Sequence, residues 1–271
     1  MTDKNPIVVM KGITIEFPGV KALDGVDLTL YPGEVHALMG ENGAGKSTMI
    51  KALTGVYKIN AGSIMVDGKP QQFNGTLDAQ NAGIATVYQE VNLCTNLSVG
   101  ENVMLGHEKR GPFGIDWKKT HEAAKKYLAQ MGLESIDPHT PLSSISIAMQ
   151  QLVAIARAMV INAKVLILDE PTNHLDMESI SWLETYLLNY PGAVFIVSHD
   201  RYFLDKVVTK VVEIEAGNMR MYSGNYSAYA LKKAQLRDAQ YKAYLNQQRE
   251  IKHQEAVITK LRSFNREKSI K

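Results

Sequence analysis

The segment from Gly40 to Ser47 constrains this chain more than any other stretch of its sequence. It reads G-E-N-G-A-G-K-S and fits the pattern G-x-x-x-x-G-K-[ST] of a phosphate-binding loop. A strand-like run at 35–39 precedes it and a helix-like run at 48–53 follows it, as the pattern requires. Glycines let backbone N–H groups turn toward phosphate oxygens, and the following helix directs its positive end at the same anion. We therefore predict that Lys46 reaches the β- and γ-phosphates and that Ser47 holds Mg²⁺; the alternative is an ordinary glycine-rich turn.

An acidic pair supplies the second chemical signal. Residues 165–168 read V-L-I-L, which is typical of a strand covered on both faces, and Asp169 and Glu170 follow directly. Because α/β sheets bind ligands at the carboxyl ends of their strands, the pair is expected near the phosphate loop. We expect Asp169 to hold Mg²⁺ and Glu170 to orient or deprotonate an attacking water. A strand that simply ends at a charged turn is the alternative, and the loop upstream argues against it.

The order of the remaining segments indicates an α/β fold. Apolar strand-like runs and helical segments alternate along the chain: strands at 84–88, 165–168 and 194–197, and helices within 97–160 and at 178–188 and 201–208. This alternation around a phosphate loop predicts a parallel sheet core of the P-loop NTPase type. The β-branched residues of 7–33 and 63–68 predict an additional antiparallel β subdomain.

The end of the chain has a different character. Residues 228–262 contain no Gly or Pro, so we expect one long helix, and Tyr244, Ile251 and Ile258 recur every seven residues, as in half of a coiled-coil hairpin. From 231 to 271 there are eleven Lys/Arg and four Asp/Glu, a net charge of +7, whereas the whole chain carries +2. This basic tail suggests a phosphate-bearing partner such as RNA, although a solvated helix is the plainer interpretation.

Cysteine content and hydropathy limit the cellular compartments that we expect for this protein. Cys94 is the single cysteine, which excludes an internal disulfide and fits a reducing compartment. No apolar run approaches the ~20 residues of a membrane helix, and residues 1–10 lack a signal-peptide pattern. We expect a cytoplasmic protein with no direct membrane insertion, which can associate with a membrane only through a partner.

The phosphate loop and the acidic pair together resemble the nucleotide-binding domain of the ATP-binding cassette (ABC) superfamily, over about residues 7–225. The resemblance implies ATP and Mg²⁺ as ligands, ATP hydrolysis, and a head-to-tail dimer with a second ABC domain. It implies these contacts: Phe17 on adenine; Gly40, Glu41, Asn42, Gly43, Ala44, Gly45, Lys46, Ser47 and Thr48 around the phosphates; Gln89 on Mg²⁺ and water; Asp169 on Mg²⁺; His199 on the γ-phosphate; and Ser146 and Asp176 from the opposite subunit.

One family motif is altered. The signature L-S-G-G-Q corresponds here to 145–149, which reads I-S-I-A-M. Ser146 is retained, whereas Ile147 and Ala148 replace both glycines, so that the backbone approaches phosphate less freely. The sequence therefore leaves the rate of turnover open.

The two parts of this chain resemble two different branches of the superfamily. Residues 1–165 resemble sugar-importer ATPases, notably at 17–23 and 97–102, which implies a membrane permease docked beside Gln89 and the helical subdomain and a peripheral location at the inner membrane. Residues 170–271 resemble ABC-F translation factors, notably at 199–205, which implies a ribosome or RNA partner through the tail. A chimera joined near 168–172 would explain both.

The main prediction is an ABC-type ATPase most like the energising subunit of a sugar importer. We expect a nucleotide-binding domain at 1–225, with a helical subdomain at about 97–160, and a basic helix at 226–271. Alternatives are an ABC-F-like ribosome-associated ATPase and a fusion that binds ATP without a physiological partner. A small-molecule kinase shares the phosphate loop but does not account for Gln89, Ser146, Asp176 and His199 together.

Overall fold

The computed structural model describes residues 5–89 and 92–268. Residues 1–4 and 90–91 of the expected domain, and 269–271 of the expected tail, lie outside the described residues. The chain divides into two units, residues 1–226 and residues 227–271.

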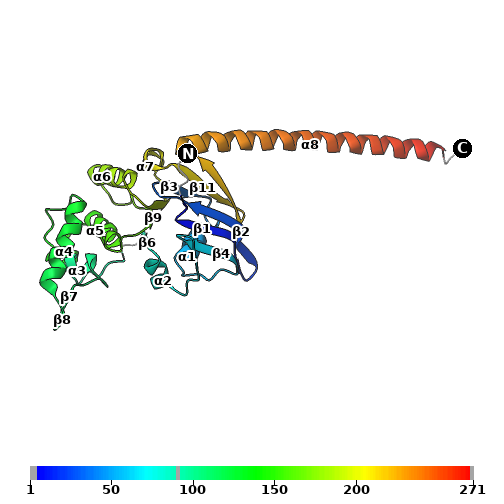
Figure 1. Ribbon diagram of the computed structural model, residues 1–271. Coiled ribbons are helices and arrows are strands. Elements are labelled where there is room, and N and C mark those ends of the chain that lie inside the picture. Colours follow the sequence, from blue (N-terminus) through cyan, green and yellow to red (C-terminus); the bar gives the residue numbers. More distant parts are fainter. Residues whose placement is uncertain (1–4, 90–91, 269–271) are drawn as a thin grey trace. The chain divides into compact units, whose positions relative to one another are not determined.

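A six-stranded sheet forms the centre of the first unit (Figure 1). Its strands, in spatial order, are β12 (Asn218–Ser223), β11 (Lys210–Glu215), β3 (Val35–Met39), β10 (Ala193–Val197), β9 (Val165–Asp169) and β6 (Ile84–Val87). The five strands from β11 to β6 pair in parallel, and only β12 is antiparallel to its neighbour. This arrangement confirms the predicted parallel α/β core.

The strands β11 and β12 were not predicted from the sequence. Glu213 interrupts the apolar pattern of β11, yet it is only 2% exposed. The hydroxyl of Tyr222 on β12 donates a hydrogen bond to the Glu213 carboxylate over 3.1 Å, which compensates its burial. The hydrophobic pattern alone therefore does not predict the strands at this edge of the sheet.

A four-stranded antiparallel sheet covers the phosphate-loop side of the core. Its order is β2 (Val20–Leu30), β1 (Val8–Phe17), β4 (Ala61–Val66) and β5 (Lys69–Gln71). Within the region expected to be β-rich, β1 is one continuous strand that bends at Gly12, where φ is 60° and the register shifts. Residues 18–19 form the turn between β1 and β2.

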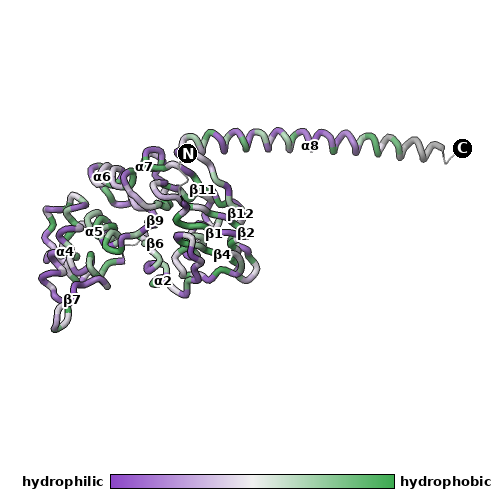
Figure 2. Tube along the Cα trace, viewed as in Figure 1, coloured by the Kyte–Doolittle hydropathy of each residue, from purple (hydrophilic) through white to green (hydrophobic). Residues whose placement is uncertain are grey.

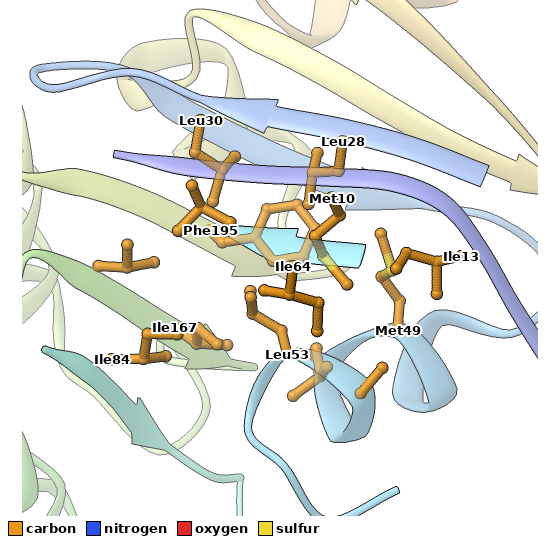
Figure 3. Packing of buried hydrophobic residues seen from close by; sticks show 14 of the residues in the cluster. Met10, Ile13, Leu28, Leu30, Met49, Leu53, Ile64, Ile84, Ile167 and Phe195 are labelled. Carbon is orange, nitrogen blue, oxygen red and sulfur yellow. The ribbon is translucent and has the colours of Figure 1, made fainter. Parts of the chain in front are cut away.

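Helix α1 (Lys46–Leu53) joins the two sheets into one hydrophobic core. Figure 3 shows Met49 and Leu53 of this helix facing the cluster that contains Met10 of the antiparallel sheet and Phe195 of the central sheet. The short helix α2 (Thr76–Asn81) leads into β6. The core thus fixes α1, and with it the phosphate loop, against both sheets.

Three helices make up the segment from 97 to 160. They are α3 (Val99–Val103), α4 (Trp117–Gln130) and α5 (Ile147–Val160). A 3-10 turn (Leu142–Ser144) precedes α5. A small hairpin of β7 (Arg110–Gly111) and β8 (Gly114–Ile115) separates α3 from α4. Helices α6 (Met177–Leu188) and α7 (Arg201–Val207) follow β9 and β10, close to their predicted bounds.

The second unit consists of the greater part of α8 (Tyr226–Lys268), a continuous helix of 43 residues. Hydrophilic residues predominate along it (Figure 2). The side chains of Tyr244, Ile251 and Ile258, which recur every seven residues, are 41–54% exposed. Within the described parts of the chain, no helix combines the length and the hydropathy needed to cross a membrane.

Candidate nucleotide-binding site

The phosphate loop connects the end of β3 to the start of α1, and two of its glycines are required by their surroundings. Gly40 has φ 149°, and a Cβ there would lie 2.5 Å from the carbonyl oxygen of Ile214. Gly45 has φ 109°, and a Cβ there would lie 2.7 Å from the carbonyl oxygen of Ala22. The close approach of β2 and β11 therefore dictates the glycines at both ends of the loop.

The start of α1 is arranged to receive an anion. Gly45 occupies the N-cap position, and in the described part of the chain no side chain caps this helix. The ammonium of Lys46 donates hydrogen bonds to the carbonyl oxygens of Gly40, over 2.7 Å, and Glu41, over 3.0 Å. The loop thus combines uncapped helical N–H groups with a fixed positive charge, as phosphate binding requires.

A cavity of about 320 Å³ opens in front of this loop. The residues that line it are Asn42, Gly43, Gly45, Lys46, Ser47, Thr48, Gln89, Asp169, Glu170, Val197 and His199. Apart from the loop, these residues lie at or just beyond the carboxyl ends of β6, β9 and β10. The parallel sheet therefore brings together side chains that are more than 100 residues apart in sequence.

Asp169 and Glu170 occupy the floor of this cavity. Asp169 ends β9, and burial raises the pKa of its carboxyl, although the charge of Lys46 opposes this shift. Glu170 is 8% exposed and has φ 48°, a left-handed conformation that is unusual for a residue other than glycine. Its N–H donates to the carbonyl oxygen of Val197 over 2.8 Å. Burial also raises the pKa of Glu170, while the backbone hydrogen bond and the charge of His199 lower it by less.

His199 follows β10 and partners Glu170. Its backbone N–H donates to the Glu170 carboxylate over 3.2 Å, and its Nε2 lies 3.4 Å from Oε1 of the same group. The His199 side chain is 75% exposed and lines the cavity. One oxygen of the Glu170 carboxylate therefore accepts a hydrogen bond from the main chain, and the other lies beside the solvent-accessible ring of His199.

Three predicted site residues that do not belong to the phosphate loop lie outside this cavity. The Phe17 ring packs edge-on against Tyr57, with 5.4 Å between ring centroids. Ser146 is the N-cap of α5, where its hydroxyl accepts the Met149 N–H over 3.3 Å. Asp176 is the N-cap of α6, and the hydrogen bonds from Ser179 lower the pKa of its carboxyl. One chain alone thus does not bring Ser146 and Asp176 to the phosphate loop.

The remaining loop residues, Gly40, Glu41 and Ala44, shape the loop through their main chain rather than lining the cavity. Ala44 N–H donates to the Glu41 carbonyl over 3.1 Å, and Lys46 bonds to the carbonyls of Gly40 and Glu41. Their predicted ligand contacts stay a prediction.

The oxygen donors in the cavity suit magnesium that is shared with phosphates. The described residues contain no cluster of three or more His, Cys, Asp or Glu side chains suited to a metal ion. The cavity offers instead the Ser47 hydroxyl, the Gln89 amide and the Asp169 carboxylate. Mg²⁺ prefers oxygen ligands and commonly takes one or two carboxylates together with substrate phosphates, so the donor set fits this ion.

Two contributors were missed in the sequence. Val197 holds Glu170 through its main-chain carbonyl, and the apolar run at 194–197 gives no signal for that role. Arg157 of α5 donates to the carbonyl oxygen of Asn92 over 2.9 Å, which ties the segment after Gln89 to the helices. Both contacts depend on tertiary packing rather than on a local motif.

Comparison with known proteins identifies the family. A family model described as ABC transporter matches residues 23–173, more than half of the chain. The chain belongs to the ABC transporter family. A second model with the same description matches residues 212–271.

Several bacterial relatives of this ABC protein are import proteins. It is 87% identical over 210 residues to the fructose import ATP-binding protein FruK of Bifidobacterium longum, covering 76% of this chain and 40% of that protein. It is 49% identical over 198 residues to the ribose import ATP-binding protein RbsA 1 of Agrobacterium fabrum, covering 72% of this chain and 39% of the relative. The chain therefore spans about two-fifths of the length of these relatives.

Solved structures show the same cassette fold. The cbiO1 subunit of Clostridium perfringens, part of an ABC transporter complex, gives a TM-score of 0.71 at 26% identity, covering 87% of this chain and 94% of that one. A bacterial ABC transporter cassette described as dimeric gives 0.67 at 25% identity, covering 80% and 98%. Together with the sheets described above, these matches confirm the predicted α/β ABC fold.

The comparisons do not support the chimera or the ABC-F resemblance. The relatives named above are import proteins, and the model that matches the tail is also described as ABC transporter. A match over 76% of the chain crosses residues 168–172 wherever it begins. The structure is continuous there as well, since β9 pairs with β6 on one side and β10 on the other.

Proposed function

We propose that this chain binds Mg-ATP and hydrolyses it as an energising cassette of a sugar importer. The convergence of the phosphate loop, Asp169, Glu170 and His199 on one cavity carries the ATPase part of the proposal. The sugar class is supported by relatives that are named as fructose, ribose and xylose import ATP-binding proteins. Because the chain spans only part of those relatives, the individual sugar is not assigned.

In this proposal the protein acts mainly by positioning and by neutralising charge. The loop N–H groups and Lys46 hold the β- and γ-phosphates. Glu170 orients and deprotonates the attacking water, a role that its raised pKa favours, because a base works best with a pKa nearer the working pH. His199 lies beside Glu170 and contacts the γ-phosphate. Ser47, Gln89 and Asp169 would hold Mg²⁺, which neutralises phosphate charge when bound.

A second cassette would complete the site. Ser146 and Asp176 lie on exposed helix caps away from the cavity, so a head-to-tail partner is needed to bring such residues to the phosphates. Ile147, at a glycine position of the signature, is 56% exposed at the start of α5 and would face the partner's nucleotide. Phe17, which is 38% exposed, remains available to stack on adenine.

A membrane permease is the second proposed partner of this chain. The contact between Arg157 and the segment after Gln89 links the edge of the nucleotide cavity to the helices of 97–160. A permease docked on those helices could therefore sense the nucleotide through Gln89. In this arrangement residues 1–225 form the nucleotide-binding domain, 226–271 an appended basic helix, and the protein sits at the cytoplasmic face of the inner membrane.

Phosphate release and nucleotide binding of Glu170→Gln test the proposal. Losing a positioned base lowers a rate by about 10²–10⁴-fold, and we expect a loss in this range with ATP affinity retained. In the presence of ATP the variant should also elute as a dimer in size-exclusion chromatography with light scattering. The control is Glu122→Gln on the exposed face of α4, which should hydrolyse ATP as the unmodified chain does. Unchanged turnover of Glu170→Gln would refute the assigned base, and absence of ATP binding by the unmodified chain would refute the proposal as a whole.

A further inference from the structure

A second cavity, of about 650 Å³, lies outside the nucleotide site. It is lined by residues of α4, of the end of α5 and the segment after it, and of α6 and the segment after it, and we call it the α4–α6 cavity. Its volume falls within the ~300–1,000 Å³ that is usual for small-molecule sites. None of its lining residues carries a formal charge, which distinguishes it from the nucleotide cavity with its lysine and two carboxylates.

Three aromatic rings form a ladder along one side of this cavity. Trp182 and Tyr186 stack with ring centroids 5.3 Å apart and planes at 12°, and Tyr190 follows at 5.7 Å from Tyr186. The three residues are spaced by four in sequence, so they share one face of α6 and of the turn after it. All three are half-buried, which leaves part of each ring accessible from the cavity.

Hydrogen-bonding groups accompany the rings. The Tyr190 hydroxyl donates to the carbonyl oxygen of Ala163 over 2.6 Å, and this bond fixes the end of the ladder. Within the described residues, neither the Trp182 indole N–H nor the Tyr186 hydroxyl has a hydrogen-bond partner. The indole nitrogen faces Gly132, where a Cβ would lie 3.7 Å away, so the absence of a side chain leaves room beside it.

Neutral amides complete the lining. Gln130 ends α4, Asn162 follows α5 and Asn189 follows α6, and all three are exposed at the cavity. Burial raises the pKa of Tyr190 to about 12 and raises that of Tyr186 as well, so both phenols stay neutral at physiological pH. An anionic ligand would therefore find no countercharge among the lining residues, and its desolvation would be uncompensated.

We propose that the α4–α6 cavity binds a neutral monosaccharide. The C–H face of a sugar ring packs on aromatic side chains, while its hydroxyl groups both donate and accept hydrogen bonds, as the unpaired indole N–H, the phenol and the amides require. Phosphorylated sugars and nucleotides are disfavoured, because the lining offers no positive charge to their phosphates. The proposal concerns a site separate from the ATP cavity and does not depend on nucleotide binding.

The two tryptophans of the chain make the site directly observable. Trp182 lines the cavity, whereas Trp117, at the start of α4, does not. In a Trp117→Phe background, Trp182 is the sole indole, and its fluorescence is titrated with D-fructose and with D-ribose in the absence of nucleotide. We expect a saturable change with a Kd of about 1 mM, a value set by the affinity per atom of small polar ligands. Glucose 6-phosphate and glycerol at equal concentration should give no saturable change.

Removing one hydroxyl tests the assigned contacts. Tyr186→Phe in the same background keeps the ring and should weaken sugar binding about tenfold, as expected for a lost hydrogen bond in a partly buried site. Tyr244→Phe, on an exposed position of α8, is the matched control and should leave the Kd unchanged. Circular dichroism establishes that both variants are folded.

Three outcomes would overturn the proposal. They are the absence of a saturable change with either sugar, an equal response to glucose 6-phosphate, and an unchanged Kd in Tyr186→Phe. If a proline-rich peptide gives a saturable fluorescence change and neither sugar does, the proposal is wrong and the aromatic ladder binds a polypeptide instead. Because no nucleotide is present in these titrations, their result is independent of whether the chain hydrolyses ATP.

Discussion

At the scale of single residues, backbone geometry explains why the phosphate loop accepts so few side chains. Gly45 combines a positive φ with a carbonyl oxygen 2.7 Å from where a Cβ would be. Gly25 on β2 also has a positive φ, of 63°, but nothing lies within 4 Å of its Cβ position. The pair separates the cost of backbone conformation from the cost of a steric contact.

We predict that Gly45→Ala destabilises the chain more than Gly25→Ala. A left-handed alanine costs about 1–2 kcal/mol at either position, and overpacking adds about 1–3 kcal/mol at residue 45 alone. Urea unfolding of both variants measures the difference, and ATP affinity should fall only for Gly45→Ala. Equal destabilisation would show that β2 moves away from the loop without cost.

A second residue-scale feature is the ionisable cluster on β3. His36 is fully buried, and its Nε2 lies 2.9 Å from Glu34, which also accepts from Lys210 over 2.8 Å. Tyr31 packs over the Lys210 ammonium. Burial lowers the pKa of His36 despite the nearby carboxylate. Burial alone would raise the pKa of Glu34, but hydrogen bonds from Lys210 and His36 outweigh it and lower that pKa.

Stability should therefore fall as the solution becomes more acidic. Below the ordinary histidine pKa of 6.5 the unfolded chain takes up a proton at residue 36 that the folded chain resists, so the free energy of unfolding decreases. One such group contributes up to about 1.4 kcal/mol per pH unit. We expect His36→Leu to flatten the profile between pH 6.5 and 5, measured by urea unfolding, whereas His253→Leu on α8 should not. The lowered pKa of Glu34 also makes the free energy of unfolding fall with acidification, but only near pH 4, where the carboxylate takes up a proton in the unfolded chain.

At the scale of elements, α5 and α6 begin at the residues that the family resemblance assigns to a partner's nucleotide. Asp176 accepts the Ser179 N–H over 2.8 Å, and Ser146 accepts the Met149 N–H over 3.3 Å. Serine and aspartate are both favoured at helix N-caps, so capping alone accounts for these two residue types without a role at a partner's nucleotide. Structural and catalytic roles must therefore be separated by substitution.

Two substitutions of Asp176 make this separation. Asp176→Ala removes the cap and should cost about 1 kcal/mol of unfolding free energy, because one helical N–H loses its acceptor. Asp176→Ser retains a capping oxygen and should keep most of that stability, yet it removes the carboxylate. If Asp176 acts across a dimer, both variants lose ATP-dependent phosphate release. Full activity in Asp176→Ser would restrict the residue to capping.

At the scale of the whole molecule, the first unit and the long helix differ in what holds them together. Strands from before and after residue 170 share one sheet and one core, as Ile167 and Phe195 illustrate (Figure 3). Such a core unfolds cooperatively. From residue 234 to residue 259, by contrast, every side chain of α8 except Gln248 is exposed.

We therefore predict that deleting residues 234–271 leaves the first unit intact. The deletion removes exposed helix and almost no buried apolar surface, so the thermal midpoint of the first unit should change by no more than a few degrees. Calorimetry should give one transition, and ATP affinity should match that of the full chain. A loss of nucleotide binding, or two transitions, would show that the first unit is not a single cooperative body.

The sequence by itself determined the features that depend on neighbouring residues. The spacing of Gly40, Lys46 and Ser47, the apolar run before Asp169, and a long stretch without Gly or Pro are local patterns with local physical causes. They were sufficient to predict the parallel core, the phosphate loop, the acidic pair and the C-terminal helix. The fold class and the family follow from them.

Only the tertiary structure decided what depends on packing between distant segments. It added β11 and β12 to the sheet by pairing β11 with β3 and β12 with β11, and the hydroxyl of Tyr222 compensates the burial of Glu213. It placed His199 against Glu170 through the pairing of β9 and β10. It also formed the α4–α6 cavity from three separate segments. Strand register and helix packing set these distances, and a linear sequence pattern carries no direct record of them because the contacts span tens of residues.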